Sequence, residues 1–312
     1  MVGSGLFRYL SQKGHVVVPA YNGQKIDSGV QLNITDAQQV SLTVAKIKPD
    51  WIIHCAAMTD VDECERDFEK AMKINADATG TIASTAKKNG VKLAYLSTSF
   101  VFGNSKNALL EDALAQPVNN YGKSKLAGER RVAESGVEYI VVRIDQPYGW
   151  VKLGQKENMV TGTLRKLKEG KPFNVVDDWC NSPTYLSNFY GLLEALIKKD
   201  AFGIFNCTGK THLSRFEWAQ KIATEFDMDV KLIRKMNSST LNLPAKRPDV
   251  VLDVGKIENA TGIKIFSVEA GLNQMKKSEQ FSWESIAKQY LGLYEKSIYP
   301  TENKKQKVLV KN

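Results

Sequence analysis

Short apolar runs alternate with longer stretches of helical periodicity along most of this chain. The apolar runs are predicted strands, and the most continuous of them span residues 51–57, 93–96 and 138–143. Such near-continuous hydrophobicity is typical of strands that are buried on both faces of a parallel sheet. Helical stretches separate these runs, among them residues 71–88 and 159–169. The alternation predicts an α/β fold that is built on a parallel sheet.

The first predicted element is a helix and not a strand. Residues 1–10 have helical character, with Gly3 and Gly5 near the start, and the apolar run 15–18 follows. A doubly wound nucleotide-binding sheet normally opens with a strand and a glycine-rich turn ahead of this helix. We therefore expect the first strand, which is central in such a sheet, to be missing. Either the chain begins inside the natural protein, which we favour, or it is a degenerate relative.

Composition limits the classes of protein that come into question. The chain has 312 residues, of which 43% are hydrophobic, so it is long enough for one large domain or two smaller ones. No apolar run approaches the roughly 18 residues of a membrane span, and no signal-peptide pattern opens the chain. We expect a soluble, cytoplasmic protein that does not bind membranes.

Neither disulfides nor a metal site is predicted. No CxxC pair occurs among the four cysteines, which are interpreted as reduced: Cys55, Cys64, Cys180 and Cys207. The three histidines do not have the spacing of metal ligands: His15, His54 and His212. An acidic group could imitate a metal site, but we interpret it as the solvated start of a helix: Asp60, Asp62, Glu63 and Glu65.

The net charge of +9 does not by itself indicate a nucleic-acid-binding protein. The lysines are spread along helical stretches and enriched in the tail 304–311, and no cluster of aromatic and basic residues resembles a single-strand platform. We expect affinity for anionic, phosphate-bearing small molecules and a solvated tail.

The candidate chemistry lies between residues 93 and 129. Tyr121 and Lys125 are four residues apart in a predicted helix, so their side chains share one face. A lysine ammonium about 4 Å from a phenol attracts the phenolate by about 4 kcal/mol at an effective dielectric constant of about 20, before desolvation is subtracted. We therefore expect Lys125 to lower the pKa of Tyr121 and to make it a proton donor to a carbonyl oxygen near neutral pH.

Spacing alone does not establish this site. Two further pairs have the same spacing and are interpreted as exposed helix residues: Tyr9 with Lys13, and Tyr21 with Lys25. Tyr121 differs because Thr98 ends an apolar strand a little over twenty residues before it. Strand ends and the following helices converge on one crevice in a parallel α/β sheet, so Thr98 and Tyr121 should reach the same carbonyl.

Several segments together resemble one protein family. They are, in order, 32–36 (LNITD), 55–59 (CAAMT) with Val61-Asp62, Asn75, 96–102 (LSTSFVF), 120–129 (NYGKSKLAGE), 175–178 (VVDD), 182–184 (SPT) and Arg247-Pro248. The chain resembles, over residues 3–275, the extended short-chain dehydrogenases/reductases of the dTDP-4-dehydrorhamnose reductase (RmlD-like) type. The resemblance implies a Rossmann-type doubly wound sheet with a smaller C-terminal substrate-binding domain. It also implies NADPH or NADH as cofactor and a nucleotide-linked sugar as substrate.

The resemblance also implies roles for individual residues. Tyr121 would protonate the ketone oxygen, Lys125 would lower its pKa and hold the nicotinamide ribose, and Thr98 would orient the carbonyl. The cofactor would be bound by Tyr121, Lys125 and a further set: Gly3, Gly5, Asn33, Ile34, Ala56, Ala57 and Met58. Each of these residues also has a structural alternative, such as close packing at Ala56 and Ala57.

The chain departs from the family at the expected substrate contacts. Ser99 stands where the reductases usually have Asp, and Gln146 stands where they have Trp. The sugar or its orientation is therefore left open, and no acidic residue or arginine at the end of strand 16–18 separates NAD from NADP. Residues 281–291 resemble instead the closing helix of nucleotide-sugar glycosyltransferases, and we interpret them as an amphipathic helix that docks on the surface.

Our leading hypothesis is an NAD(P)H-dependent reductase of a 4-keto nucleotide sugar, in dTDP-rhamnose biosynthesis. One rival is a non-catalytic binding subunit that resembles the beta subunit of methionine adenosyltransferase, and another is a nucleotide-sugar epimerase. We assign residues 1–149 and about 172–206 to the NAD(P)-binding domain, about 150–171 and 207–275 to the substrate domain, and 276–312 to a helix and basic tail. Whether the protein is a homodimer stays open.

Overall fold

The computed structural model describes residues 1–278 except 24, 27 and 152–154. Its α-helices are α1 (Val2–Gln12), α2 (Ala37–Ile47), α3 (Val61–Arg66), α4 (Phe68–Met72), α5 (Ala78–Lys88), α6 (Asn120–Glu134), α7 (Met159–Lys168), α8 (Leu186–Lys198), α9 (Arg215–Glu225), α10 (Gly255–Thr261) and α11 (Val268–Lys277). Its strands are β1 (Ala20–Tyr21), β2 (Val30–Gln31), β3 (Trp51–His54), β4 (Lys92–Thr98), β5 (Ser105–Leu109), β6 (Tyr139–Ile144), β7 (Phe173–Val176), β8 (Cys180–Asn181), β9 (Gly203–Asn206), β10 (Leu213–Ser214), β11 (Ile233–Met236) and β12 (Val250–Leu252).

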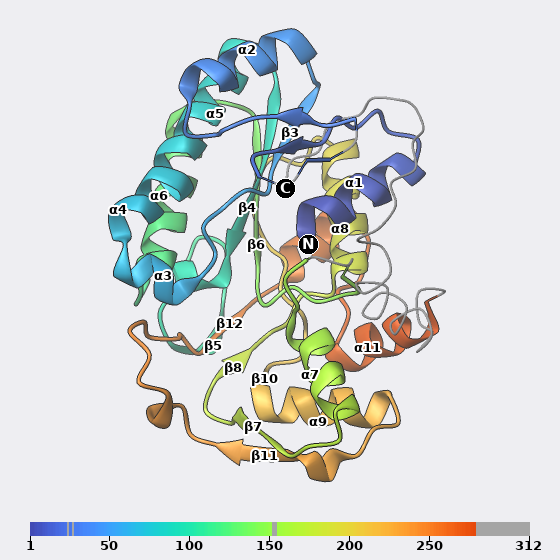
Figure 1. Cartoon of the computed structure of the whole chain (residues 1–312). Coiled ribbons are helices and arrows are strands. Elements are labelled where there is room, and N and C mark those ends of the chain that lie inside the picture. Colours follow the sequence, from blue (N-terminus) through green and yellow to red (C-terminus); the bar gives the residue numbers. More distant parts are fainter. Residues whose placement is uncertain (24, 27, 152–154, 279–312) are drawn as a thin grey trace, which may run out of the picture.

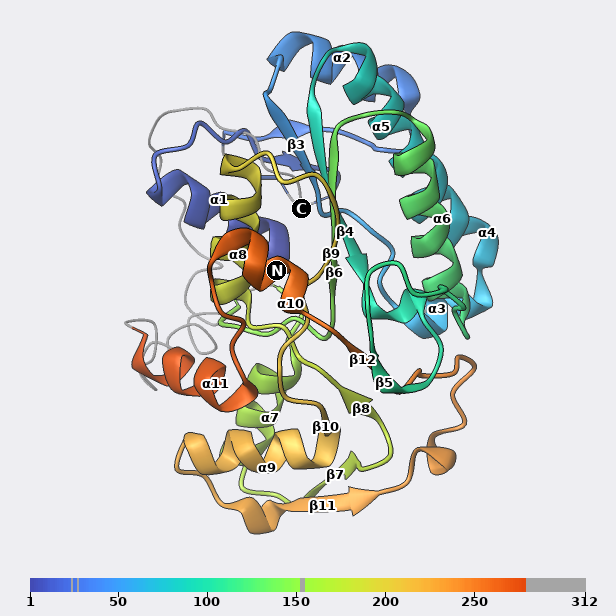
Figure 2. The same ribbon diagram turned by 180° about the vertical axis from the view of Figure 1, so that it is seen from behind.

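A four-stranded parallel sheet in the order β3-β4-β6-β9 forms the centre of the larger part of the molecule. Figures 1 and 2 show α2, α5 and α6 on one face of this sheet and α1, α8 and α10 on the other. Each face has its own apolar core, and alternate residues of β4 point into them, Leu93 and Tyr95 to one and Ala94 and Leu96 to the other. The predicted parallel α/β fold, covered on both faces, is confirmed.

The sheet ends at β3 within the described part of the chain. β1 and β2 form a separate parallel pair, in which Ala20 lies opposite Val30. Residues 16–18 are not assigned to a named strand, in contrast to the prediction, and Val16 is 87% exposed. The apolar strand 51–57 was expected to be buried on both faces, but Trp51, Ile52 and Ile53 are only half-buried. One physical reason is that no described strand flanks β3 on the side away from β4.

A smaller part lies below the sheet in Figure 1 and contains α7, α9, α11 and short strand pairs. β7 pairs with β11 in parallel, and β8 pairs with β10 in antiparallel. The sequence-based division placed residues 172–206 in the first domain. The structure instead puts β7 and β8 in the smaller part, because their partners lie there, whereas α8 and β9 stay with the main sheet.

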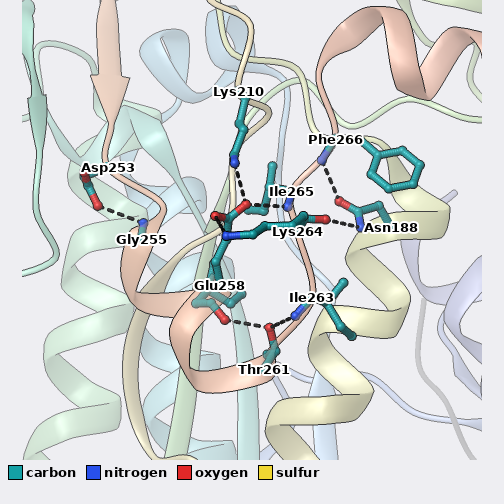
Figure 3. A network of polar contacts seen from close by, with 11 residues as sticks. Asn188, Lys210, Asp253, Gly255, Glu258, Thr261, Ile263, Lys264, Ile265 and Phe266 are labelled. Carbon is teal, nitrogen blue, oxygen red and sulfur yellow. Dashed lines mark hydrogen bonds and ion pairs between the residues drawn. The ribbon is translucent and has the colours of Figure 1, made fainter.

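After the smaller part, the segment with α10 passes back to the main sheet. Ile257 of α10 and Ile265 are buried in the core that α1 and α8 share. Figure 3 shows the polar contacts that hold this segment: Glu258 accepts hydrogen bonds from Lys210 Nζ and from the Ile265 backbone N–H, both at 2.7 Å. On α8, the Asn188 side chain donates to the Lys264 carbonyl and accepts from the Phe266 N–H. Residues 255–266 therefore belong to the packing of the sheet, although the sequence placed them in the substrate domain.

The predicted helix 71–88 is interrupted. α4 ends at Met72, a π-helical turn occupies Lys73–Asp77, and α5 begins at Ala78. Asn75 sits in this turn with its side chain fully buried. π turns often lie at functional sites because they redirect a side chain from the helical path. The predicted helix over 281–291 and the basic tail lie outside the described residues.

Candidate active site

The carboxyl ends of β4 and β6 and the start of α6 form the candidate site. α6 begins at Asn120 because the Asn119 side chain caps it, accepting from the Gly122 N–H at 2.8 Å. Tyr121 lies in the first turn of α6, and its hydroxyl hydrogen-bonds with Thr98 at the end of β4. Gly122 allows this approach, since a Cβ there would collide with the backbone of Phe100. The structure thus brings the Thr98 and Tyr121 side chains together, and their reach to one carbonyl stays a prediction.

Lys125 lies one turn further along α6 and is almost completely buried. Its ammonium donates to the Leu96 carbonyl at 2.6 Å and lies 4.0 Å from the centroid of the Tyr95 ring. Burial lowers the pKa of Lys125 to about 7, and the Glu129 carboxylate opposes that shift. A lysine with this pKa changes its charge near neutral pH.

The expected effect of Lys125 on Tyr121 is wrong for the ligand-free protein. Burial raises the pKa of the Tyr121 phenol, and the Asp145 charge raises it further, while the hydrogen bond with Thr98 opposes them. Lys125 does not lower it, because its ammonium is directed at Leu96 and Tyr95. Tyr121 is thus a protonated phenol at neutral pH, which is the form that a proton donor needs.

A buried ion pair connects α6 to the neighbouring strand β6. Arg143 of β6 binds both carboxylate oxygens of Glu129, at 3.0 and 2.7 Å, and donates to the Glu111 carbonyl at 2.9 Å. Both side chains of the pair are only 4% exposed. A bidentate pair of this kind has a fixed geometry, and it locks the Lys125 turn of α6 to the sheet.

Asn75 joins the end of β3 to α6. Its amide oxygen accepts from the Met58 N–H at 2.8 Å, and its amide nitrogen donates to the Met58 carbonyl at 3.0 Å and to the Ser124 hydroxyl at 2.9 Å. Ser124 lies between Tyr121 and Lys125 in the sequence and is fully buried. Asn75 therefore fixes the segment after β3 relative to the candidate catalytic helix. The sequence placed Asn75 in the family pattern without giving it a role.

The remaining predicted cofactor residues lie along the same edge or in the helix that opens the chain. Ala56 and Ala57 follow β3 and are half-buried, and their small side chains leave backbone accessible. Gly3 and Gly5 lie in α1, whose first turn carries no acidic residue, so its N-terminus suits a phosphate group. Gly5 also has a packing role, because a Cβ there would overlap the Tyr190 hydroxyl of α8.

Asn33 and Ile34 lie after β2. The Asn33 side chain accepts from the Thr35 N–H and hydroxyl, at 3.1 and 2.9 Å, and Ile34 is buried in the core with α2. These contacts shape the loop between β2 and α2. Asp36 then caps α2 by accepting from the Gln39 N–H.

Asp145 is a candidate site residue that the sequence reasoning missed. It follows β6, is 3% exposed, and accepts from the Ser182 N–H at 2.8 Å and from the Asn181 side-chain amide at 3.5 Å, and the Ser99 hydroxyl helps to lower its pKa. Burial raises the pKa of this carboxyl group, and its hydrogen bonds and the Arg215 charge oppose the shift. The adjacent Gln146 has a left-handed φ of 34°, a strained conformation that is common at functional sites. Of the two predicted substrate contacts, Ser99 thus lies close to this buried carboxyl group and Gln146 follows it directly in the chain.

A cavity of about 510 Å³ opens in the smaller part near this edge. It is lined by Asn104, Val118, Asp178, Trp179, Ser238, Ser239, Asn242, Leu243, Ala245, Lys246 and Arg247. The Arg247 and Arg215 guanidinium groups lie 5.1 and 5.2 Å from the Trp179 ring. The Asn119 side chain donates to the Lys246 carbonyl at 2.8 Å and so ties the cavity wall to the start of α6. An aromatic ring between cations can bind a base and a phosphate.

Arg247 is held by a residue from the acidic group. Its guanidinium binds both oxygens of Asp62, at 2.9 and 2.6 Å, and this lowers the pKa of that carboxyl group. Asp60 caps α3, and Glu65 accepts from the Asn120 N–H. Part of the predicted solvated helix start is therefore a connection between the two parts of the molecule.

The structure also assembles a group that the spacing of the histidines did not indicate. Potential ligand atoms of Cys180, His212 and Asp249 lie within 4.8 Å of one another. His212 Nε2 is 2.7 Å from Asp249, and its Nδ1 is 3.0 Å from the Ser182 hydroxyl. Both ring nitrogens therefore already have protein partners. The four cysteines are free thiols.

Comparisons with known proteins agree with this geometry. Residues 1–281 match the family model described as RmlD substrate binding domain. The chain is 32% identical over 252 residues to the dTDP-4-dehydrorhamnose reductase of Mycolicibacterium smegmatis, covering 80% of this chain and 73% of that protein. It is 30% identical over 235 residues to methionine adenosyltransferase 2 subunit beta of Pongo abelii, covering 73% and 70%.

A solved structure extends the similarity to three dimensions. The dTDP-4-dehydrorhamnose reductase of Bacillus anthracis, in complex with NADP, matches with a TM-score of 0.75 at 30% identity, covering 83% of this chain and 98% of that one. In the described part of the chain, no helix has the length and hydrophobicity to cross a membrane.

Proposed function

The chain belongs to the RmlD substrate binding domain family, and we propose that it is an NAD(P)H-dependent reductase of a 4-keto nucleotide sugar of the dTDP-4-dehydrorhamnose type. The observation that carries the proposal is the contact between the protonated Tyr121 phenol and Thr98, one turn from the buried Lys125. The similar reductases from Mycolicibacterium smegmatis and Bacillus anthracis support the reaction, and the NADP complex of the latter supports the cofactor.

Each catalytic group has one task in this proposal. The nicotinamide cofactor supplies the hydride that reduces the carbonyl carbon. Tyr121 donates a proton to the ketone oxygen, and Thr98 holds that oxygen by a hydrogen bond. Lys125 binds the nicotinamide ribose, and its positive charge favours the phenolate that forms on Tyr121 one helical turn away. Ala56, Ala57 and Met58 line the cofactor, with Met58 held in place by Asn75.

The cofactor residues at the start of the chain belong to the same proposal. The N-terminus of α1, with Gly3 and Gly5, binds the pyrophosphate, while Asn33 and Ile34 lie near the adenine. NADPH and NADH are both retained as candidates.

The substrate occupies the cavity next to α6 in this proposal. Trp179 contacts the base, and the exposed Lys246 in the cavity wall neutralises the diphosphate, because Arg247 is already paired with Asp62. Ser99 and Gln146 face the sugar, and Asp145 supplies beside them the carboxylate that position 99 lacks. A cytoplasmic location and a homodimer complete the proposal, and cell fractionation and light scattering test them.

A non-catalytic binding subunit is the second candidate. The similarity to methionine adenosyltransferase 2 subunit beta and the altered residues Ser99 and Gln146 favour it. The intact Thr98, Tyr121 and Lys125 favour the enzyme. An epimerase would return its cofactor unchanged and would show no net consumption of NADPH.

The substitution Tyr121→Phe tests the proposal. We expect NADPH oxidation with dTDP-4-dehydrorhamnose to fall about 10² to 10⁴-fold, because the proton donor is lost, while NADPH binding is retained. Tyr9→Phe is the matched control, since Tyr9 is also four residues before a lysine but its hydroxyl binds Glu194 at 3.0 Å. Turnover by Tyr121→Phe at the unsubstituted rate would refute the catalytic role, and an unsubstituted protein that binds NADPH without oxidising it would favour the binding subunit.

A further inference from the structure

A cysteine, a histidine and an aspartate that are far apart in the sequence meet beside the cavity of the smaller part. Potential ligand atoms of Cys180, His212 and Asp249 lie within 4.8 Å of one another. Cys180 directly follows Trp179 of the cavity wall. The Asp249 N–H donates to the side chain of Asn104, another residue of that wall, at 2.9 Å. The three side chains are therefore held next to the cavity.

The pairing of β8 with β10 places two of these side chains on one face. Leu213 lies opposite Asn181, and Ser214 lies opposite Cys180. Because side chains alternate between the two faces of a strand pair, Cys180 and His212 are diagonal neighbours on the same face. Two hydrogen-bonded strands thus hold together a thiol and an imidazole, which are ligand types that zinc prefers.

Asp249 supplies the third group from another part of the fold. It precedes β12, and its backbone carbonyl accepts from the Ser105 N–H of β5 at 2.8 Å. Its side chain is 57% exposed, and among the described residues its carboxylate makes a hydrogen bond only with His212, at 2.7 Å. The backbone is thus fixed, while the carboxylate is free to turn toward an ion that enters from solvent.

The His212 ring is held on its other side by a buried hydroxyl group. Its Nδ1 lies 3.0 Å from the hydroxyl oxygen of Ser182, which is 2% exposed. A hydroxyl group can accept from a ring N–H, so a proton on Nδ1 leaves the Nε2 lone pair available next to Asp249. A hydrogen bond from the second ring nitrogen is the usual support for a histidine that binds a metal.

We propose that Cys180, His212 and Asp249 bind a zinc ion through Sγ, Nε2 and a carboxylate oxygen, with water as the fourth ligand. A thiolate, an imidazole and a carboxylate are ligands of tetrahedral zinc sites, and three protein ligands leave one position for water. Ligand atoms in such a site lie roughly 3.4–3.6 Å apart, so the His212–Asp249 contact of 2.7 Å opens as the exposed carboxylate turns. The Cys180 thiol releases its proton to solvent, because the thiolate is the ligand. The imidazole stays neutral with its proton on Nδ1.

A zinc ion at this place connects the two parts of the molecule. Cys180 and His212 belong to the β8–β10 pair of the smaller part, whereas Val250 and Leu252 of β12 pack with Leu126 of α6. Figures 1 and 2 show β12 beside β8, between the main sheet and the smaller part. The ion therefore fixes the cavity wall relative to α6. It also stabilises the folded chain, since the unfolded chain has no preformed site.

Metal titration of the full-length chain tests this inference without reference to the reductase activity. The chain is freed of metal with EDTA, and zinc binding is measured by isothermal titration calorimetry. We expect one zinc ion per chain. Cys180→Ser and His212→Gln should each weaken zinc binding by at least about 100-fold, because each removes one of the three protein ligands. Cobalt, used in place of zinc, should give a thiolate-to-cobalt charge-transfer band that Cys180→Ser lacks.

Two control variants are matched to these ligands. Cys55→Ser changes the other half-buried cysteine. His15→Gln removes an imidazole that lies 2.8 Å from the Glu194 carboxylate, a pair beside which the described residues place no third cysteine, histidine or acidic ligand. Both controls should keep the zinc affinity of the unsubstituted chain. Circular dichroism of the metal-free variants shows whether they remain folded.

A further measurement needs no substitution. Zinc should slow the alkylation of Cys180 in the unsubstituted chain at least about 10-fold, as followed by mass spectrometry of its peptide, because a metal-bound thiolate is a poor nucleophile. Alkylation at an unchanged rate would overturn the proposal.

The titrations have equally definite outcomes. Loss of zinc binding in both ligand variants, with both controls unchanged, would support the site. A metal-free chain that binds no zinc would overturn it, as would an unchanged affinity in Cys180→Ser, which would place the ion elsewhere. One zinc ion per two chains would also overturn it, because the ion would then lie between copies.

Discussion

Replacing Asn75 by alanine should separate the segment after β3 from the candidate catalytic helix. Three hydrogen bonds of the Asn75 amide are lost at once, to the Met58 N–H, the Met58 carbonyl and the Ser124 hydroxyl. The Ser124 hydroxyl keeps a partner in the Tyr121 carbonyl, 2.8 Å away, but the Met58 N–H has no other protein partner among the described residues.

The expected cost follows from these contacts. A buried donor without a partner costs about 1–3 kcal/mol, and each further hydrogen bond that is lost costs about 1 kcal/mol. We therefore expect Asn75→Ala to lower the free energy of unfolding by about 3–5 kcal/mol. Because Met58 and Ser124 are no longer held together, we also expect weaker NADPH binding.

Urea unfolding with an unchanged m-value measures the first effect. Asn89→Ala is the matched control, since the Asn89 amide makes a single bond of 2.8 Å to the Thr85 carbonyl and is exposed. That control should change the free energy of unfolding by no more than about 0.5 kcal/mol. A loss below about 1 kcal/mol in Asn75→Ala, or one equal to that of Asn89→Ala, would refute the reasoning.

Three further predictions concern packing and charge. Gly128→Ala should destabilise the protein by about 1–3 kcal/mol in urea unfolding, because the new methyl group would lie 2.5 Å from a backbone oxygen, whereas Gly23→Ala has open space and should be neutral. Glu194 has a pKa of about 2 in the folded protein against an ordinary 4.5, since its basic and hydroxyl partners outweigh its burial. Its contribution, on the order of 3 kcal/mol, is therefore complete above pH 4.5 and is lost as the pH falls toward 2. Stability curves of Glu194→Gln should lack this acid-sensitive contribution, and an equally steep acid loss would contradict it. Asp145→Asn should lower the pKa of Tyr121, because a negative charge that raises it is removed. The basic limb of the pH–rate profile should then move to lower pH, and an unmoved limb would show that Asp145 does not act on Tyr121.

Much of the fold could be predicted from local pattern. The apolar runs at β3, β4 and β6 and the helices between them follow from hydrophobic periodicity. The interrupted helix at Asn75 could not be predicted in this way. Its π turn places the Asn75 side chain so that it forms hydrogen bonds with Met58 and Ser124, which are distant in the sequence. The positions of β7 and β8 also depended on their partners, β11 and β10.

The candidate site shows the same division. The sequence by itself determined that Tyr121 and Lys125 share a helix face and that Thr98 ends a strand nearby, since helical spacing and strand order are local properties. Only the tertiary structure decided the ionisation of these groups, because burial raises the pKa of Tyr121 and lowers that of Lys125. It also brought Asp145 to Ser99. Desolvation depends on everything that surrounds a group, and no stretch of the chain contains that information by itself.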